Sequence, residues 1–129
     1  MKIALAQLNY HIGNFDQNTD KIIGEVKKAK TLGAELIVFA EMAICGYPPR
    51  DFLDFDDFIE NCYLSLDKIA AECVGIAAVV GCPSRNIDNK GKRLHNSAFF
   101  LDEGKIKTLA TPKRCLDCRK LKKERKAFE

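Results

Sequence analysis

The sequence predicts an α/β fold in which helices pack on a mixed sheet. Short apolar runs, which suit buried strands, alternate along the chain with longer segments that carry apolar residues at helical spacing. The first strand, helix and second strand follow one another through short links, an order that implies a parallel pair with a right-handed crossover. A hairpin near residue 100 adds antiparallel strands, so the predicted sheet is mixed.

The first half of the chain predicts a strand, a helix and a second strand. Residues 2–8 alternate weakly between apolar and polar side chains and predict a strand. The helix begins at a cap formed by Asn18 or Asp16 and ends near residue 32, where Gly33 can stop it. Residues 35–40 are mostly apolar and predict a short strand covered on both faces. The buried face of this helix is predicted to contain Ile22, Val26 and Ala29.

The second half predicts another helix and three more strands. Residues 58–73 predict the helix, and the apolar residues 76–80 predict a third strand. Residues 96–101 and 105–109 predict two strands joined by a tight Asp-Glu-Gly turn. The apolar stripe of the second helix comprises Ile59, Cys62, Tyr63, Leu66, Ile69, Ala70 and Cys73.

Composition indicates a globular chain, with 47% hydrophobic and 30% charged residues. No apolar run approaches the ~20 residues that a membrane span needs, so we expect no membrane association and a cytoplasmic location. Several of the six cysteines lie on apolar helix or strand positions. Reduced, buried cysteines behave as small hydrophobic residues, so we expect free thiols rather than disulfides.

The net positive charge of the chain is concentrated at its C-terminal end. Residues 112–129 contain eight Lys or Arg against three acidic residues, whereas the preceding part is close to neutral. We therefore divide the chain into a domain over residues 1–110 and a basic tail over residues 111–129. Cys115 and Cys118 lie in this tail, but no second ligand pair follows them, so we expect no zinc site. The tail also lacks interleaved aromatic residues before Phe128, and we do not expect nucleic-acid binding.

Glu41 is the first candidate functional residue, because it follows directly after the apolar run 35–40. Ligands in open α/β sheets gather outside the carboxyl ends of strands. Partial burial there makes a carboxylate a better proton acceptor near neutral pH. The segment 46–49, Gly-Tyr-Pro-Pro, cannot continue the strand and predicts a stiff loop. Glu41 could equally cap the next helix or lie in solvent.

Several segments of the chain together form the pattern of a protein family: residues 2–9, 13–15 with Asn18, 33–39, Glu41, 46–51, 81–83, 95–98 and 102–105. They resemble the nitrilase, or carbon–nitrogen hydrolase, superfamily, and are most similar to the N-terminal glutaminase domain of glutamine-dependent NAD⁺ synthetases. The Gly-Tyr-Pro-Pro-Arg-Asp segment is the part most specific to that branch. The resemblance implies the first half of a nitrilase-type α-β-β-α sandwich.

The resemblance also implies a glutamate, a lysine and a nucleophilic cysteine that together hydrolyse the side-chain amide of glutamine. Glu41 matches the general base. The expected place of the lysine falls at Pro112, which makes Lys113 the adjacent candidate for stabilising the oxyanion. No cysteine matches the nucleophile, and Cys45 is interpreted as structural. A shifted reading frame is one hypothesis for the departure near position 112, and resequencing the coding region tests it.

The implied activity is the release of ammonia from glutamine for ATP-dependent synthesis of NAD⁺ from deamido-NAD⁺. We expect these 129 residues to hold no cofactor and to be inactive alone, since ATP and Mg²⁺ belong to a synthetase domain that is absent here. We also expect homo-oligomers, because half of a sandwich leaves an apolar sheet face uncovered. Two alternatives stay open: another amidase of the superfamily, or a non-enzymatic module that binds through the basic tail.

Overall fold

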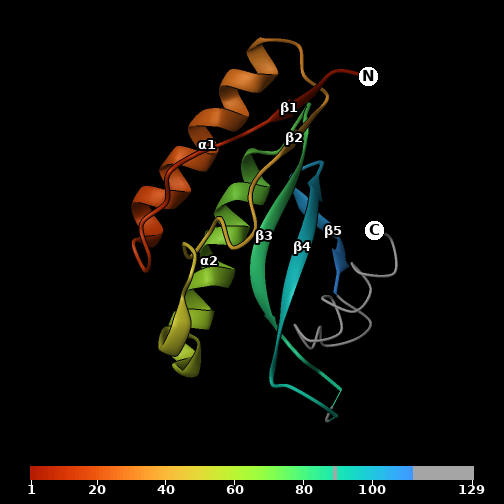
Figure 1. The fold of residues 1–129 in the computed structure, drawn as a ribbon. Coiled ribbons are helices and arrows are strands. Elements are labelled where there is room, and N and C mark those ends of the chain that lie inside the picture. Colours follow the sequence, from red (N-terminus) through yellow and green to blue (C-terminus); the bar gives the residue numbers. More distant parts are fainter. Residues whose placement is uncertain (89, 112–129) are drawn as a thin grey trace, which may run out of the picture.

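The structure is a computed structural model that describes residues 1–88 and 90–111. Within these residues the chain folds into one five-stranded sheet and two α-helices, and a short 3₁₀ helix precedes the second of them (Figure 1). Lys113, Cys115 and Cys118 lie outside the described residues, as does nearly all of the predicted basic tail. The elements are β1 (Ile3–Leu5), α1 (Phe15–Thr31), β2 (Leu36–Val38), η1 (Arg50–Asp54), α2 (Asp56–Glu72), β3 (Ala77–Arg85), β4 (Leu94–Asp102) and β5 (Lys105–Ala110).

The sheet follows the order of the sequence, β1-β2-β3-β4-β5. The β1–β2 and β2–β3 pairs are parallel, and the β3–β4 and β4–β5 pairs are antiparallel. The parallel pairs are joined by α1 and α2, whereas β3, β4 and β5 are joined by hairpins. The predicted α/β class and mixed sheet are therefore confirmed.

Both helices lie on the same side of the sheet (Figure 1). They pack against each other, and their buried faces contain the stripes predicted from the sequence, with Ile22 and Val26 on α1 and Ile59 and Leu66 on α2. The strands contribute alternate residues to this core, because successive side chains of a strand point to opposite faces of the sheet. The strand residues in the core are Ile37, Ala78, Val80, Cys82, Phe99 and Leu101.

The start of α1 differs from the prediction. Asn14 caps the helix, and its side chain accepts a hydrogen bond from the backbone N–H of Gln17. Asn18, one of the two predicted caps, is instead completely buried. Its side chain bonds both backbone groups of His11 and the carbonyl of Ile44, so it joins two loops to the helix.

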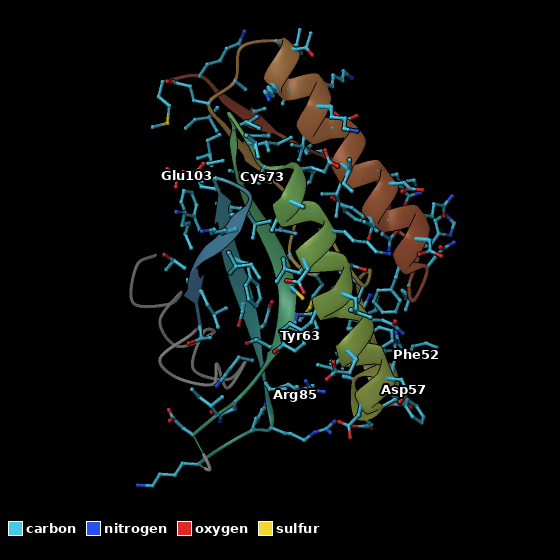
Figure 2. All side chains as sticks on the ribbon, turned by 180° about the vertical axis from the view of Figure 1, so that it is seen from behind. Phe52, Asp57, Tyr63, Cys73, Arg85 and Glu103 are labelled. Carbon is cyan, nitrogen blue, oxygen red and sulfur yellow. The ribbon has the colours of Figure 1, made fainter. Side chains whose placement is uncertain are left out.

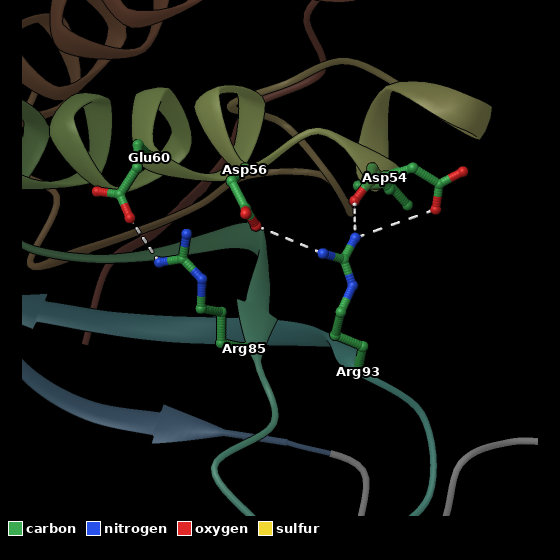
Figure 3. Close-up of polar contacts among 6 residues, drawn as sticks. Asp54, Asp56, Glu60, Arg85 and Arg93 are labelled. Carbon is green, nitrogen blue, oxygen red and sulfur yellow. Dashed lines mark hydrogen bonds and ion pairs between the residues drawn. The ribbon is translucent and has the colours of Figure 1, made fainter.

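The hairpin of β3 and β4 is linked to η1 and the start of α2 by two arginines, Arg85 at the end of β3 and Arg93 immediately before β4 (Figure 3). Arg85 pairs with Glu60 at 2.7 Å, and Arg93 contacts Asp56 at 3.4 Å and Asp54 at 4.0 Å. Figure 2 shows Tyr63 of α2 beside Arg85, and the Tyr63 hydroxyl accepts a 2.8 Å hydrogen bond from the Arg85 backbone. Exposed ion pairs of this kind stabilise a fold by ~0–1 kcal/mol each, so they orient the hairpin rather than hold the core together.

The sheet face opposite the helices is uncovered in the described part of the chain. One row of side chains crosses it on all five strands, since the registers place Leu5, Val38, Val79, Phe100 and Thr108 opposite one another. Leu5 is 76% exposed. The prediction that residues 35–40 are covered on both faces is therefore wrong for the described residues, because both helices lie on the other side.

Strand β3 is longer than predicted and includes Pro83. Proline has no backbone N–H to donate to a neighbouring strand, so it is found in edge strands rather than in strands paired on both sides. The pairing with β2 ends at Val79, so β3 has only β4 beside it at Pro83, which pairs with Asn96. The strand continues past a proline because that part of it is locally an edge.

Candidate functional site

Glu41 lies in a turn that follows the carboxyl end of β2, on the uncovered side of the sheet. It lines two neighbouring hollows. The first, of about 330 Å³, is open towards the loop after β1, and the second, of about 450 Å³, lies over β3 and β4. The first hollow is lined by Leu8, Asn9, Tyr10, Ala40, Glu41 and Tyr47. The second is lined by Phe39, Ala40, Glu41, Val79, Gly81, Asn96, Ser97, Ala98, Ala110 and Thr111.

Gly81 of β3 lets the backbone of the Glu41 turn lie directly against the sheet. A Cβ atom at position 81 would be 2.6 Å from the Ala40 carbonyl oxygen and the Met42 nitrogen, and 2.8 Å from the Glu41 Cα. These are backbone atoms, so no side-chain movement could relieve the contact. Any larger residue at position 81 must therefore displace the glutamate.

The same turn is held on its other side by the loop after β1. Gly13 donates a 2.9 Å backbone hydrogen bond to Cys45, and the buried Asn18 side chain donates to Ile44 at 3.1 Å. Gly46 has a positive φ of 82°, and a Cβ there would lie 2.8 Å from backbone atoms of Ile12. Met42, next to the glutamate, has a φ of 53°, a left-handed conformation that is uncommon for a non-glycine residue. The turn is thus fixed from two directions.

Asn96 of β4 is the polar side chain that contacts Glu41. Its Nδ2 donates a hydrogen bond to the Glu41 Oε1, although the two residues are 55 positions apart in the sequence. The site therefore joins the end of β2 to β4 across Gly81 of β3. Asn96 belongs to one of the sequence segments that resemble the family, residues 95–98. It was not predicted as a site residue, because no local pattern links positions 41 and 96.

The Glu41 side chain is exposed rather than partly buried as expected. The physical reason is its position on the sheet face that the described residues leave uncovered. Nearby Tyr10 is half-buried, and this burial raises the pKa of its phenol to about 12. A tyrosine is neutral near pH 7 even at its ordinary pKa of about 10, and the upward shift of the pKa keeps Tyr10 neutral well into the alkaline range.

The four described cysteines are free thiols and are all buried, as predicted. The contact with the Cys62 thiol, together with burial, raises the pKa of Cys45 far above its usual range. Burial raises the pKa of Cys73 to about 11. A thiol that stays protonated is a poor nucleophile, so these residues behave as parts of the core. The description of Cys45 as a structural residue agrees with this environment.

No group of three or more potential ligand residues that could hold a metal ion occurs within residues 1–88 and 90–111. No helix in these ranges is long and apolar enough to cross a membrane. The described site consists of the Glu41 carboxylate and the Asn96 amide that donates to it, and it opens to two hollows.

Comparison with protein families matches residues 2–126 to the family described as carbon-nitrogen hydrolase. This match extends beyond residue 110, so the predicted boundary between domain and basic tail stays a prediction. A relative in Xanthomonas campestris, a glutamine-dependent NAD(+) synthetase, is 40% identical over 107 residues, which are 82% of this chain and 19% of that protein. The chain thus spans about a fifth of the length of the curated relatives it matches.

Solved structures share the fold. A glutamine-dependent NAD(+) synthetase from Cytophaga hutchinsonii superimposes with a TM-score of 0.79 at 23% identity, covering 89% of this chain and 19% of that one. An amidase from Nesterenkonia sp. AN1 superimposes with a TM-score of 0.71 at 23% identity, covering 88% of this chain and 44% of the amidase. Crystals of an amidase variant contain acrylamide joined to the active-site cysteine by Michael addition. The described half-sandwich is therefore part of a nitrilase fold.

Proposed function

Because the chain belongs to the carbon–nitrogen hydrolase family, we propose that residues 1–110 are the first part of a glutaminase domain. Its reaction releases ammonia from glutamine for ATP-dependent amidation of deamido-NAD⁺ to NAD⁺. The observation that carries the proposal is the place of Glu41. The carboxylate lies at the carboxyl end of a parallel strand, beside two hollows, on a turn that glycines and a buried asparagine hold in place.

In this proposal Glu41 is the general base. It accepts the proton of a cysteine thiol, and the thiolate attacks the amide carbon of glutamine. Ammonia leaves with a proton returned by the glutamate, and water then hydrolyses the thioester. Lys113 is the candidate that stabilises the oxyanion. The four described cysteines are buried away from solvent. The proposal therefore places the nucleophile outside residues 1–111.

ATP and Mg²⁺ act in a synthetase domain under this proposal, and no step of the glutaminase reaction passes through them here. The described residues do not fit Mg²⁺, because no group of three or more His, Cys, Asp or Glu within residues 1–88 and 90–111 could hold a metal ion. Glutamine is the substrate we propose for the part described, because of its similarity to glutamine-dependent NAD(+) synthetases, and we expect a cytoplasmic metabolic role.

The first experiment measures glutamine binding by the purified 129-residue chain with ¹⁵N-resolved NMR. Glutamine should shift signals of residues that line the two hollows, whereas glutamate at the same concentration should shift them less. Absence of any shift at the hollows in saturating glutamine would contradict the proposal. The same chain should release no ammonia from glutamine. Release that Glu41→Gln abolishes would show that the site is complete within these 129 residues.

The second candidate function is hydrolysis of another amide, and it is favoured by the structural similarity to the Nesterenkonia amidase. A binding screen with short aliphatic amides in place of glutamine separates the two. Stronger shifts with butyramide than with glutamine would favour the amidase. The binding role of the basic tail stays a separate hypothesis, which a gel-shift series over salt concentration tests.

We also propose that copies of the chain associate through the uncovered sheet face. Apolar side chains form a row on it from β1 to β4, and Leu5 and Ile3 are 76% and 51% exposed. Contiguous apolar patches of this kind commonly mark interfaces in soluble proteins.

A further inference from the structure

We propose that Asn96 is a positioning residue that fixes the Glu41 carboxylate for proton transfer. This inference deepens the proposed function and rests on it, since it concerns the same base. It begins from the hydrogen bond that the Asn96 Nδ2 donates to the Glu41 Oε1. Within the part of the chain that the structure describes, Asn96 is the side chain bonded to this carboxylate.

The position of Asn96 is set by the pairing of β3 with β4. Asn96 lies opposite Pro83, and Ala98 lies opposite Gly81, so residues 96 and 98 share the uncovered face with Gly81. On the other face, the hydroxyls of Ser84 and Ser97 form a buried 2.7 Å hydrogen bond that fixes this register. A slip of one residue would turn Asn96 to the helix side.

Glu41 and Asn96 approach one another because Gly81 has no side chain. The strands β2 and β4 flank β3 and are separated by two strand spacings, or ~10 Å. The Glu41 turn lies directly against β3 at Gly81, where a Cβ atom would be 2.8 Å from the Glu41 Cα. The two side chains then meet above the glycine. Gly81 and Asn96 therefore act together, one providing space and the other an anchor.

The chemistry of an amide suits an anchor for a base. An asparagine Nδ2 group donates hydrogen bonds and carries no titratable proton, so it can hold Oε1 without competing for the proton that Glu41 receives. The bond directs Oε1 to β4 and leaves Oε2 available beside the two hollows. A lysine or arginine there would place a full positive charge on the carboxylate and weaken it as a base.

The experiment follows the Glu41 side chain by NMR in the purified 129-residue chain. In the unmodified chain, three-bond couplings should report one Glu41 rotamer, and the Asn96 side-chain amide should shift as Glu41 is protonated. The Glu41→Gln variant should abolish that pH-dependent shift. Asn96→Ala should give averaged Glu41 rotamers, and Asn96→Asp, which loses the donor and adds like charge, should do so more strongly. Asn61→Asp on the exposed side of α2 is the matched control and should change nothing.

These measurements distinguish a failure of the Asn96 inference from a failure of the proposed glutaminase function. If Glu41 keeps a single rotamer in both Asn96 variants, the inference is overturned, whether or not glutamine binds. If the rotamer is lost in both variants while glutamine shifts no signal in the unmodified chain, the anchor stands and the glutaminase proposal fails. Backbone signals of α1 and α2 should stay unchanged in every variant, which distinguishes loss of an anchor from loss of the fold.

Discussion

The two faces of the sheet have similar side chains but different surroundings. On the helix side, Ile37 and Val80 are buried beneath α1 and α2. On the opposite side, Leu5 and Ile3 are largely exposed, although they are equally apolar. Strands that are apolar on both sides are typical of sheets covered on both faces. The contrast indicates that this sheet is built for two covering layers, and Glu41, the candidate base, lies beside the face that the described residues leave uncovered.

The largest expected effect tests the covered face. Leu66 of α2 is completely buried, whereas Leu64 on the same helix is 58% exposed. Leu66→Ala should lower the free energy of unfolding by about 2–5 kcal/mol because it leaves a cavity, and Leu64→Ala should change it by less than about 0.5 kcal/mol. Urea unfolding followed by circular dichroism measures both.

If Leu66→Ala does not fold, Ile69→Val gives a smaller loss of about 0.5–1.5 kcal/mol at another buried position of α2. Equal losses for the buried and exposed leucines would show that the helix does not pack as described.

The next effect tests the contact between the uncovered face and the Glu41 turn. Gly81→Ala should cost about 1–3 kcal/mol of stability and shift the backbone signals of the turn, because the new methyl group meets backbone atoms at 2.6 Å. Gly24→Ala in α1 is the matched control, since nothing lies within 4 Å of a Cβ there. It should stabilise the chain by up to about 1 kcal/mol, as alanine replaces glycine in a helix. Opposite signs support the close approach, and a neutral Gly81→Ala contradicts it.

A smaller effect concerns association through the uncovered face. Leu5→Lys should weaken self-association about tenfold or more, the factor expected when one leucine no longer leaves water at an interface. Light scattering over a concentration series measures the midpoint. Leu32→Lys, at an exposed position after α1, is the control. A clean monomer at high concentration for the unmodified chain would contradict the association proposal.

The class of fold, the mixed parallel and antiparallel sheet and the buried faces of the two helices could be predicted from the sequence. The spacing of apolar residues along a helix or strand directly reflects which of its residues are buried. The cap of α1 was misplaced, since Asn14 and Asn18 are both good caps by type and only tertiary contacts with His11 and Ile44 decide between them. Strand β3 was predicted too short because Pro83 is tolerated only through the early end of β2.

The site was predicted in part. Glu41 was found because it follows an apolar run, and the resemblance assigned its role, which stays a prediction. Asn96 and Gly81 were missed as site residues, because their roles depend on the pairing of β2, β3 and β4 and have no signature along the chain. Lys113 lies outside the described residues and stays a prediction as well.

The smallest expected effect concerns the pH dependence of stability, and it again compares a buried residue, Cys73, with an exposed one, Val74. Burial raises the pKa of Cys73 from 9.0 to about 11. The unfolded chain therefore loses this proton before the folded chain does, so the contribution of Cys73 to stability is constant below pH ~9 and is lost as the pH rises towards the folded pKa. Cys73→Ala should make the fall between pH 9 and 11 shallower, but not abolish it, because the pKa values of Cys45 and Cys62 are raised as well. The contact with Cys62 and burial raise the pKa of Cys45. The contact with Cys45 lowers the pKa of Cys62, but the contact with Cys82 and burial raise it and outweigh that lowering. Val74→Ala, at the neighbouring exposed residue, should leave the slope unchanged. Urea unfolding at a series of pH values measures the slope, and an identical slope in Cys73→Ala would show that this thiol is not buried in the folded chain.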